Sequence, residues 1–158
     1  MNDVHQSAAL WRLEGRLPTA DEHRQLAESV GWAHAFDWAS LPASLAASLC
    51  GVVAVAGDDV IGMGRLVGDG VMYFYIQDVV VRPDYQRQGV GQAIVTALVE
   101  HIRSMTPANA FAGLFATAEA MPLYRQNGFA EGDLTGMFQV IPATASSRGR
   151  GRRGGHRR

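Results

Sequence analysis

Two closely spaced glycines follow an apolar run and open a segment whose apolar residues recur at helical spacing. Gly89 and Gly91 come after Val79, Val80 and Val81, and the apolar stripe beyond them reaches residue 102. Glycine lets the backbone approach a ligand closely, and a helix that begins there points its unpaired N–H groups and the positive end of its dipole outward. The pattern predicts an anion site between a strand and a helix, although glycine spacing alone can also mark a tight turn.

The residues around these glycines exclude two common phosphate-binding motifs. A dinucleotide-binding Gly-x-Gly-x-x-Gly would place its first glycine on Arg87. A P-loop needs Gly-Lys-Ser/Thr, and the sequence contains no lysine. The anion is therefore not expected to be a nucleotide held by either motif.

The stretch instead resembles the pyrophosphate-binding motif of the GNAT superfamily of acyl-CoA-dependent N-acyltransferases. The motif, Gln/Arg-x-x-Gly-x-Gly/Ala, is met by Gln86, Gly89 and Gly91. Further along, Tyr124, Gly128 and Phe129 match the second family signature, Tyr-x-x-x-Gly-Phe, in the expected order. Two spaced motifs in one strand-helix-strand-helix frame are more specific than either alone. In these residues, the chain resembles a GNAT N-acetyltransferase.

The periodicity of the chain fits that frame. Thr19 and Glu22 form a capping pattern before a helix, and β-branched runs separated by Gly-Asp turns predict three antiparallel strands. The expected helices are residues 20–30, a short one ending near Leu49, 90–107 and 118–126, and the expected strands are 52–56, 60–67, 71–81, 110–116 and 134–141, the last as one closing strand or two short ones. The resemblance implies an α/β (α+β) fold: one domain over residues 1–145, a mixed and mostly antiparallel sheet of six to seven strands with a splayed central strand, and about four flanking helices.

The resemblance implies acetyl-CoA as the acyl donor. The backbone of the central strand would bind the pantetheine arm, and the N–H groups that open the long helix would bind the diphosphate. The implied cofactor-binding residues are Val79, Val80, Val81, Gln86, Arg87, Gln88, Gly89, Val90, Gly91 and Gln92.

Amide formation needs a proton acceptor, because an exposed amine with a pKa of about 10 is protonated at neutral pH. Asp78 lies just before the pantetheine-binding segment and is the first candidate, acting directly or through water. A carboxylate paired with an arginine is an equal alternative, and a β-bulge would decide whether Asp78 or Gln77 faces the cleft. Glu119 is a second candidate, although acids in a first helical turn often serve only the helix dipole.

Expulsion of the thiolate needs a proton donor. The resemblance assigns this role to Tyr124, whose phenol is neutral at pH 7. The alternative is a half-buried tyrosine that anchors its helix.

An aromatic segment between the first two helices is the candidate acceptor site. Aromatic walls and a carboxylate suit a cationic amine with an apolar body, although the aromatic residues could equally fill the core. The implied substrate-binding residues are Trp32, Phe36, Asp37, Trp38 and Tyr75, with Tyr73 near the same cleft.

Charge separates the chain into two parts. All 14 basic residues are arginine, and six of them lie in the last eleven positions. Residues 1–147 therefore hold 15 acidic residues and eight arginines, a formal charge of −7. We expect no nucleic-acid binding by this part. The Arg/Gly-rich tail, residues 146–158, is expected to be disordered and could contact RNA, DNA or an acidic partner, or have no function.

The single cysteine, Cys50, and five dispersed histidines predict neither a disulfide nor a metal site. The absence of a signal-like start and of a long apolar run predicts a cytoplasmic chain without a membrane segment. The function expected is acetyl transfer to a small cationic or aromatic amine. The alternatives are a non-catalytic acyl-CoA sensor and a protein or peptide N-acetyltransferase, and a homodimer is compatible with the family.

Overall fold

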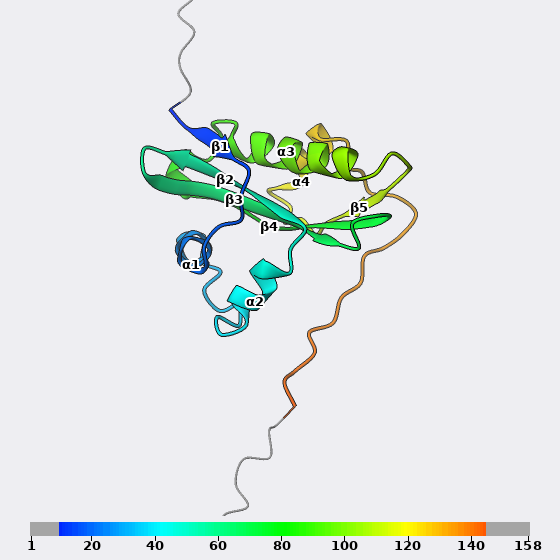
Figure 1. Ribbon diagram of the computed structural model, residues 1–158, viewed down its shortest axis with the longest axis horizontal. Helices are drawn as coiled ribbons and strands as arrows, with labels where there is room; N and C mark the ends of the chain where they lie inside the picture. Colours follow the sequence, from blue (N-terminus) through cyan, green and yellow to red (C-terminus); the bar gives the residue numbers. More distant parts are fainter. Residues whose placement is uncertain (1–9, 145–158) are drawn as a thin grey trace, which may run out of the picture.

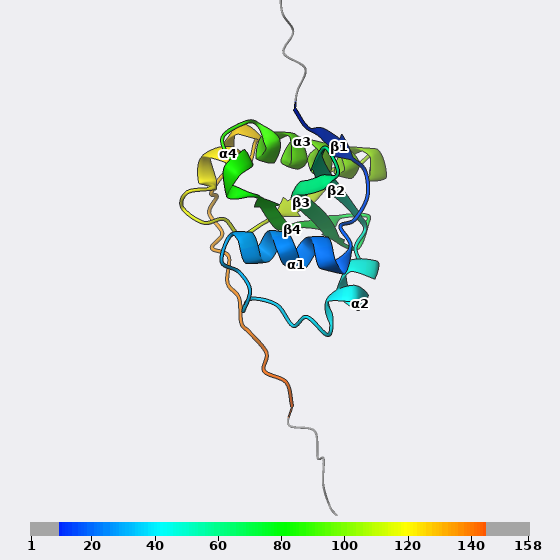
Figure 2. The same cartoon turned by 90° about the vertical axis from the view of Figure 1, so that its left-hand side faces the viewer.

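The computed structural model describes residues 10–144. These residues form one sheet with the strand order β1-β2-β3-β4-β5. Helices α1 and α2 cover one side of the sheet, and α3 and α4 lie on the other (Figures 1 and 2). The elements are β1 (Arg12–Glu14), α1 (Ala20–Ser29), α2 (Leu41–Ala46), β2 (Cys50–Ala56), β3 (Asp59–Gly68), β4 (Tyr73–Val81), a 3-10 turn (Pro83–Tyr85), α3 (Val90–Met105), β5 (Phe111–Gly113) and α4 (Met121–Gln126).

The three consecutive antiparallel strands predicted from the sequence are β2, β3 and β4. β1 adds to the outer edge of β2 in antiparallel pairing, and β5 pairs with β4 in parallel. The turn from β3 to β4 is held by Asp69, whose Oδ1 accepts hydrogen bonds from the backbone N–H groups of Val71, Met72 and Tyr73. The sheet is therefore mixed and mostly antiparallel, as expected.

The expectation of six to seven strands is wrong, since the described residues form five. Residues 134–141 form no strand, and β5 is shorter than predicted. The apolar residues of that segment are exposed, with 85% of Leu134, 89% of Met137 and 79% of Phe138 accessible to solvent. A strand needs a neighbour to pair with as well as a suitable composition, and residues 134–141 have no such neighbour in the described part of the chain.

The helices begin close to their predicted starts. Thr19 and Glu22 form the expected capping box, with Thr19 Oγ1 accepting from the N–H of Glu22 at 3.1 Å and Glu22 Oε2 accepting from the N–H of Thr19 at 2.8 Å. α4 begins at Met121, three residues later than predicted, because Pro122 suits the first turn of a helix. α2 ends before Leu49, whose N–H bonds the carbonyl of Leu66 in the sheet.

The sheet separates two apolar clusters. The larger lies under α3, whose buried side chains are Val90, Ile94, Val95, Leu98 and Ile102. The smaller lies under α1 and contains Leu26, Val53, Val55, Met63 and Val80. Strand β4 contributes to both clusters because its side chains alternate between the two faces.

A bulge interrupts that alternation in β4. Met63 pairs with Val80, but the next register pair is Arg65 with Gln77. Asp78 and Val79 therefore both stand opposite Gly64, and Asp78 has a φ of 56°. The bulge turns Asp78 toward α1 while Val79 packs on the α3 side. The sequence alone left open which face of the sheet Asp78 would lie on, and the bulge determines it.

Asp78 lies in a buried polar cluster that joins four elements. Its Oδ2 accepts hydrogen bonds from Arg65 Nε at 2.7 Å and His23 Nε2 at 3.0 Å. Arg65 Nη1 also donates to Ser44 and Ser48, the first in α2 and the second just beyond it. Burial alone would raise the pKa of Asp78, but the hydrogen bond from His23 and the charge of Arg65 outweigh it, so the pKa lies below its usual value. The carboxylate stays ionised and connects α1, α2 and β3 to the bulge.

The Arg/Gly-rich tail, residues 146–158, lies outside the described residues. No helix within residues 10–144 has both the length and the apolar character that crossing a membrane requires.

Replacing Asp78 with asparagine tests this cluster. Asparagine tolerates a positive φ but leaves the Arg65 charge buried without a counter-ion, which costs about 3 kcal/mol. We expect Asp78→Asn to lower the free energy of unfolding by that amount in urea titrations at pH 7. Because the pKa is lower in the folded state, the contribution is present above the unfolded pKa, about 3.9, and is lost as the pH falls through the folded value.

The matched control is Asp84→Asn, which removes an exposed pair with Arg82. We expect no measurable change in stability from this control, because exposed ion pairs contribute little. Equal stability of Asp78→Asn and the native chain at pH 7 would contradict the assigned role of the cluster.

Candidate functional site

The predicted anion loop, the end of β4 and the helix that carries Tyr124 enclose one cavity of about 540 Å³. Residues far apart in the sequence meet there, because α3 and α4 pack together on the same side of the sheet. Its walls consist of Val79, Val81, Gln86, Arg87, Gly89, Gly91, Gln92, Thr117, Glu119, Ala120, Leu123, Tyr124 and Gln126.

Most of the predicted cofactor-binding residues line this cavity, and three do not. Val80 is buried on the α1 side of the sheet. Val90, the first residue of α3, is buried in the cluster between that helix and the sheet. The side chain of Gln88 donates to the carbonyl of Asp84 at 3.0 Å. At these three positions, only the backbone can make the predicted contact with the cofactor.

The edge of β4 is open beside the cavity. The parallel pairing with β5 ends where Tyr75 stands opposite Gly113, and in residues 10–144 no strand lies along β4 from Ile76 to Val81 on that side. Val79 and Val81 lie in this stretch and face the cavity. This arrangement is compatible with the splayed central strand that the resemblance implies, and it leaves an edge to which an extended ligand can hydrogen-bond.

The loop before α3 is fixed by local contacts and by two positive φ angles. Gln86 Nε2 donates to the carbonyl of Val81 at 2.9 Å. Arg87 has a φ of 59°, and Gly89, at the N-terminal cap of α3, has a φ of 82°. A side chain at Gly89 would meet nothing within 4 Å, so this position faces open space at the start of a helix of 16 residues. Such a helix start favours an anion.

Gly91 has a second structural role. A Cβ there would lie 3.2 Å from Leu123 Cδ2, so the glycine also lets α4 pack closely on α3. The two helices are joined by Asn127, which donates to Gln92 Oε1 at 3.0 Å and accepts from Thr96 Oγ1 at 2.9 Å. These contacts hold α4 beside the loop.

Tyr124 lies in the cavity wall and is 8% exposed. Its ring packs edge to face on Phe129, with 6.1 Å between the ring centroids. Burial raises the pKa of Tyr124 above its ordinary value, so the phenol keeps its proton at neutral pH. A protonated phenol can act as a donor toward a developing thiolate.

The two candidate bases lie on different sides of the sheet. Asp78 is not in the cavity wall and is paired with Arg65 and His23, as the arginine-pairing alternative proposed. Its lowered pKa makes it a weaker base. Glu119 does line the cavity, three positions before Pro122 of α4.

The predicted acceptor residues divide into two groups. Phe36 and Trp38 contact each other and the ring of His23, with centroid distances of 5.4 Å between the first two and 4.8 Å from Phe36 to His23. The carboxylate of Asp37 accepts from Ala39 N–H and Ser40 Oγ, so it serves the turn before α2. Trp32, at the start of this loop, is 36% exposed.

Tyr75 belongs to the second group, at the junction of β4 and β5. It contacts Phe115 at 5.8 Å between ring centroids, and Phe115 contacts Phe138 at 5.7 Å. Tyr73 packs instead on Phe111. No sequence pattern marks Phe115 or Phe138 beyond their place in predicted strands. None marks His23 or Arg65 either, because the contacts of these two residues depend on the bulge.

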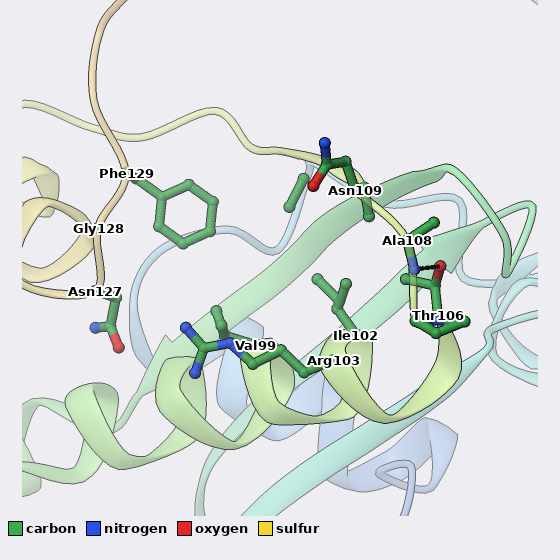
Figure 3. Close-up of a pocket in the computed structure, with 12 residues that line it drawn as sticks. Val99, Ile102, Arg103, Thr106, Ala108, Asn109, Asn127, Gly128 and Phe129 are labelled. Atoms are coloured by element: carbon green, nitrogen blue, oxygen red, sulfur yellow. Dashed lines mark hydrogen bonds between the residues drawn. The ribbon is translucent and has the colours of Figure 1, made fainter.

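A larger cavity of about 630 Å³ lies elsewhere and holds none of the predicted site residues. It lies between the C-terminal half of α3, the following segment up to Ala112, and residues 127–129, with Val99, Ile102 and Phe129 among its walls (Figure 3). It lacks a helix N-terminus and a titratable residue other than Arg103, which pairs with Glu100. The smaller cavity is therefore the better candidate.

Metal ligands are not gathered at either cavity. Across residues 10–144, no three histidine, cysteine or acidic side chains are placed to hold an ion. Cys50 is half-buried, and burial raises the pKa of its thiol.

Comparisons with known proteins agree with this geometry. The chain is similar in structure to a probable acetyltransferase from meticillin-resistant Staphylococcus aureus, with 28% identity, a TM-score of 0.76, and coverage of 83% of this chain and 99% of that one. It is 37% identical over 81 residues to a histone acetyltransferase of Glycine max, covering 49% of this chain and 34% of that protein. It is 36% identical over 70 residues to a chloroplastic serotonin N-acetyltransferase of Oryza sativa subsp. japonica, covering 44% and 34%.

The matched region spans about a third of the length of these curated relatives. The family model described as the acetyltransferase (GNAT) domain matches residues 48–131, more than half of the chain, and this range contains β4, the anion loop, α3 and Tyr124. The chain belongs to the GNAT acetyltransferase family.

Proposed function

We propose that the chain transfers an acetyl group from acetyl-CoA to a primary amine, by direct attack of the amine on the thioester while both substrates are bound. The observation that carries the proposal is the cavity that brings together the open edge of β4, the start of α3 and Tyr124. Along acetyl-CoA the diphosphate is followed by the pantetheine arm and then by the thioester sulfur, so the molecule needs the start of α3, the open edge of β4 and Tyr124 to follow one another along one groove.

The donor is held mainly by the backbone in this proposal. The free N–H groups at the start of α3 bind the diphosphate, and Arg87 adds positive charge at the rim. The unpaired half of β4 binds the pantetheine amides as a neighbouring strand would. Side chains at Val79 and Val81 then contribute only apolar contact with the arm.

The reaction needs two proton transfers. The nitrogen lone pair of the amine forms a bond to the carbonyl carbon, and the amine gives up a proton to a base. The carbon–sulfur bond then breaks, and the sulfur takes a proton from the phenol of Tyr124 as negative charge develops on it. The products are an N-acetyl amide and free coenzyme A.

The acceptor proposed is a small cationic amine with an apolar or aromatic body. Residues 1–147 carry a formal charge of −7, which favours the approach of a cation. Aromatic rings lie on the α1 side in the loop before α2 and at the junction of β4 and β5, and such rings bind cations and flat apolar groups. The two curated relatives carry names with different acceptors, a histone and serotonin, so a peptide lysine is the competing acceptor.

The first prediction concerns the diphosphate. We expect Gly89→Glu to lose measurable binding of acetyl-CoA in calorimetry, because a carboxylate at the start of α3 repels the diphosphate and occupies its space. Gly57→Glu is the matched control, since Gly57 has a φ of 60°, meets nothing within 4 Å and lies in the turn between β2 and β3. The two variants carry similar backbone strain, so equal affinities in both would refute the proposed diphosphate site.

The second prediction concerns the proton donor. Tyr124→Phe keeps the ring but removes the phenol, and we expect kcat to fall about 10²-fold, the usual order for loss of a general acid. The affinity for acetyl-CoA should stay within about twofold of the native value. Tyr85→Phe, which alters a phenol beside Arg82, serves as the control. Native turnover in Tyr124→Phe would remove the assigned role.

The third prediction concerns the acceptor. We expect thiol release from acetyl-CoA to be fastest with tryptamine and 2-phenylethylamine, slower with spermidine, and absent with anionic amino acids such as glutamate. A histone-tail peptide tests the competing acceptor. Activity confined to glutamate would contradict the charge argument, and tight binding of acetyl-CoA without turnover on any amine would favour a sensor over an enzyme.

A further inference from the structure

One nitrogen of a buried histidine has no hydrogen-bond partner. His23 lies in α1 and is fully buried, and its Nε2 is 3.0 Å from Asp78 Oδ2. Its Nδ1 is the only buried side-chain nitrogen or oxygen in residues 10–144 without a partner. Buried polar atoms are nearly always paired, so this exception calls for an explanation.

The contact with Asp78 determines the tautomer of the ring. An ionised carboxylate can only accept hydrogen bonds, so Nε2 carries a hydrogen. In a neutral imidazole the other nitrogen then holds the free lone pair, which places a proton acceptor at Nδ1. Arg65, 2.7 Å from the same carboxylate oxygen, keeps Asp78 ionised and in place.

The loop between α1 and α2 places two aromatic rings against His23. Phe36 and Trp38 pack against the ring from the loop between α1 and α2, and both are half-buried, so they contact His23 and solvent at once. The loop has no regular secondary structure between α1 and α2. Because Nδ1 is buried, a bound molecule reaches it only if the side chains that cover it move, and the faces of Phe36 and Trp38 would attract the cationic group of that molecule.

His23 also lies next to the groove proposed for the donor. Its partner Asp78 precedes Val79, which lines the 540 Å³ cavity from the other side of the sheet. β4 has no strand beside it at this point within the described residues, so no hydrogen-bonded neighbour covers this edge. The amine of the proposed reaction would then lie on the α1 side of β4 and the thioester along its unpaired edge.

We infer that Nδ1 of His23 accepts the proton that the acceptor amine gives up, with Asp78 and Arg65 as positioning residues. The inference rests on the proposed acetyl transfer. The amine's proton moves to Nδ1 as its lone pair bonds to the acetyl carbon, and the imidazolium is stabilised by Asp78 until the proton passes to solvent. Glu119 lies on the opposite side of the sheet, among the residues that line the donor cavity.

Charged groups face His23 from the elements packed around it. Asp78 and Arg65 face it from β4 and β3. In the neighbouring loop, Asp37 is engaged with Ser40, and the guanidinium of Arg24 lies 4.9 Å from the centre of the Trp38 ring. Asp78 is the only one of these carboxylates in contact with the ring, and it also pairs with Arg65, so a proton gained at Nδ1 leaves the cluster with one net positive charge until the proton passes to solvent.

The test compares pH profiles of His23→Gln and the native chain. Glutamine can still donate to Asp78 from the place of Nε2 but has no basic nitrogen. With tryptamine as acceptor, we expect kcat/KM of the variant at pH 7 to be about 10²-fold lower than that of the native chain. This difference should become smaller as the pH approaches the amine pKa of about 10. Binding of acetyl-CoA should be unchanged. A purely structural role would lower the rate by the same factor at every pH.

A second variant keeps the test decisive if glutamine disturbs the fold. In His23→Ala we expect added imidazole to raise kcat/KM at least tenfold. His101→Gln, on α3, should keep the native pH profile. No rescue together with a parallel pH profile would overturn the role of His23 and leave acetyl transfer standing. Failure of the native chain to acetylate tryptamine, 2-phenylethylamine, spermidine or the histone peptide would overturn the proposed function and this inference together.

Discussion

The arrangement of the whole molecule depends on the way β4 leaves the regular sheet. Two residues of β4 stand opposite Gly64, and beyond Tyr75 the strand has no partner on its β5 side in the described chain. Such an irregularity costs free energy, because a non-glycine residue at positive φ and an unpaired strand edge are both unfavourable. The buried cluster of Asp78, Arg65 and His23 supplies the compensating contacts and ties the bulge to α1 and α2.

The bulge gives the two faces of the sheet different tasks. On the α3 side, Val79 and Val81 join the start of α3 and Tyr124 around one cavity. On the α1 side, Asp78 joins a polar cluster covered by aromatic rings. A regular strand that continued the alternation of Phe74 and Ile76 would have placed Asp78 on the α3 side, whereas the bulge turns it toward α1 and lets one short segment face both the proposed donor groove and the proposed acceptor side.

Local patterns in the sequence predicted the parts of the fold that depend on local interactions. The capping residues Thr19 and Glu22, the turn glycines and the apolar stripe of α3 act within a few positions, and these elements were found close to their predicted bounds. The loop with Gln86, Gly89 and Gly91 was found beside Tyr124, as the two motifs implied. Residues 134–141 show the limit of this reasoning, since their composition suits a strand but pairing requires a neighbouring edge that the sequence does not specify.

The contacts of the polar cluster could not be predicted from local sequence patterns either. Nothing local marks His23 as a partner of Asp78, which lies 55 positions away, or Arg65 as the residue that keeps the carboxylate ionised. Their meeting depends on the phase change at the bulge and on the packing of α1 over β3 and β4. The predicted acceptor residues fall into two groups for a similar reason. Tyr75 lies on β4, whereas Phe36 and Trp38 lie in the loop that packs over His23.

The proposed donor groove can be tested by a crystal structure with coenzyme A bound. We expect the diphosphate within hydrogen-bond distance of the backbone N–H groups from Arg87 to Gln92, the pantetheine arm along the open half of β4, and the sulfur beside the Tyr124 hydroxyl. Coenzyme A in the 630 Å³ cavity beside Phe129, or a sulfur directed away from Tyr124, would contradict this proposal.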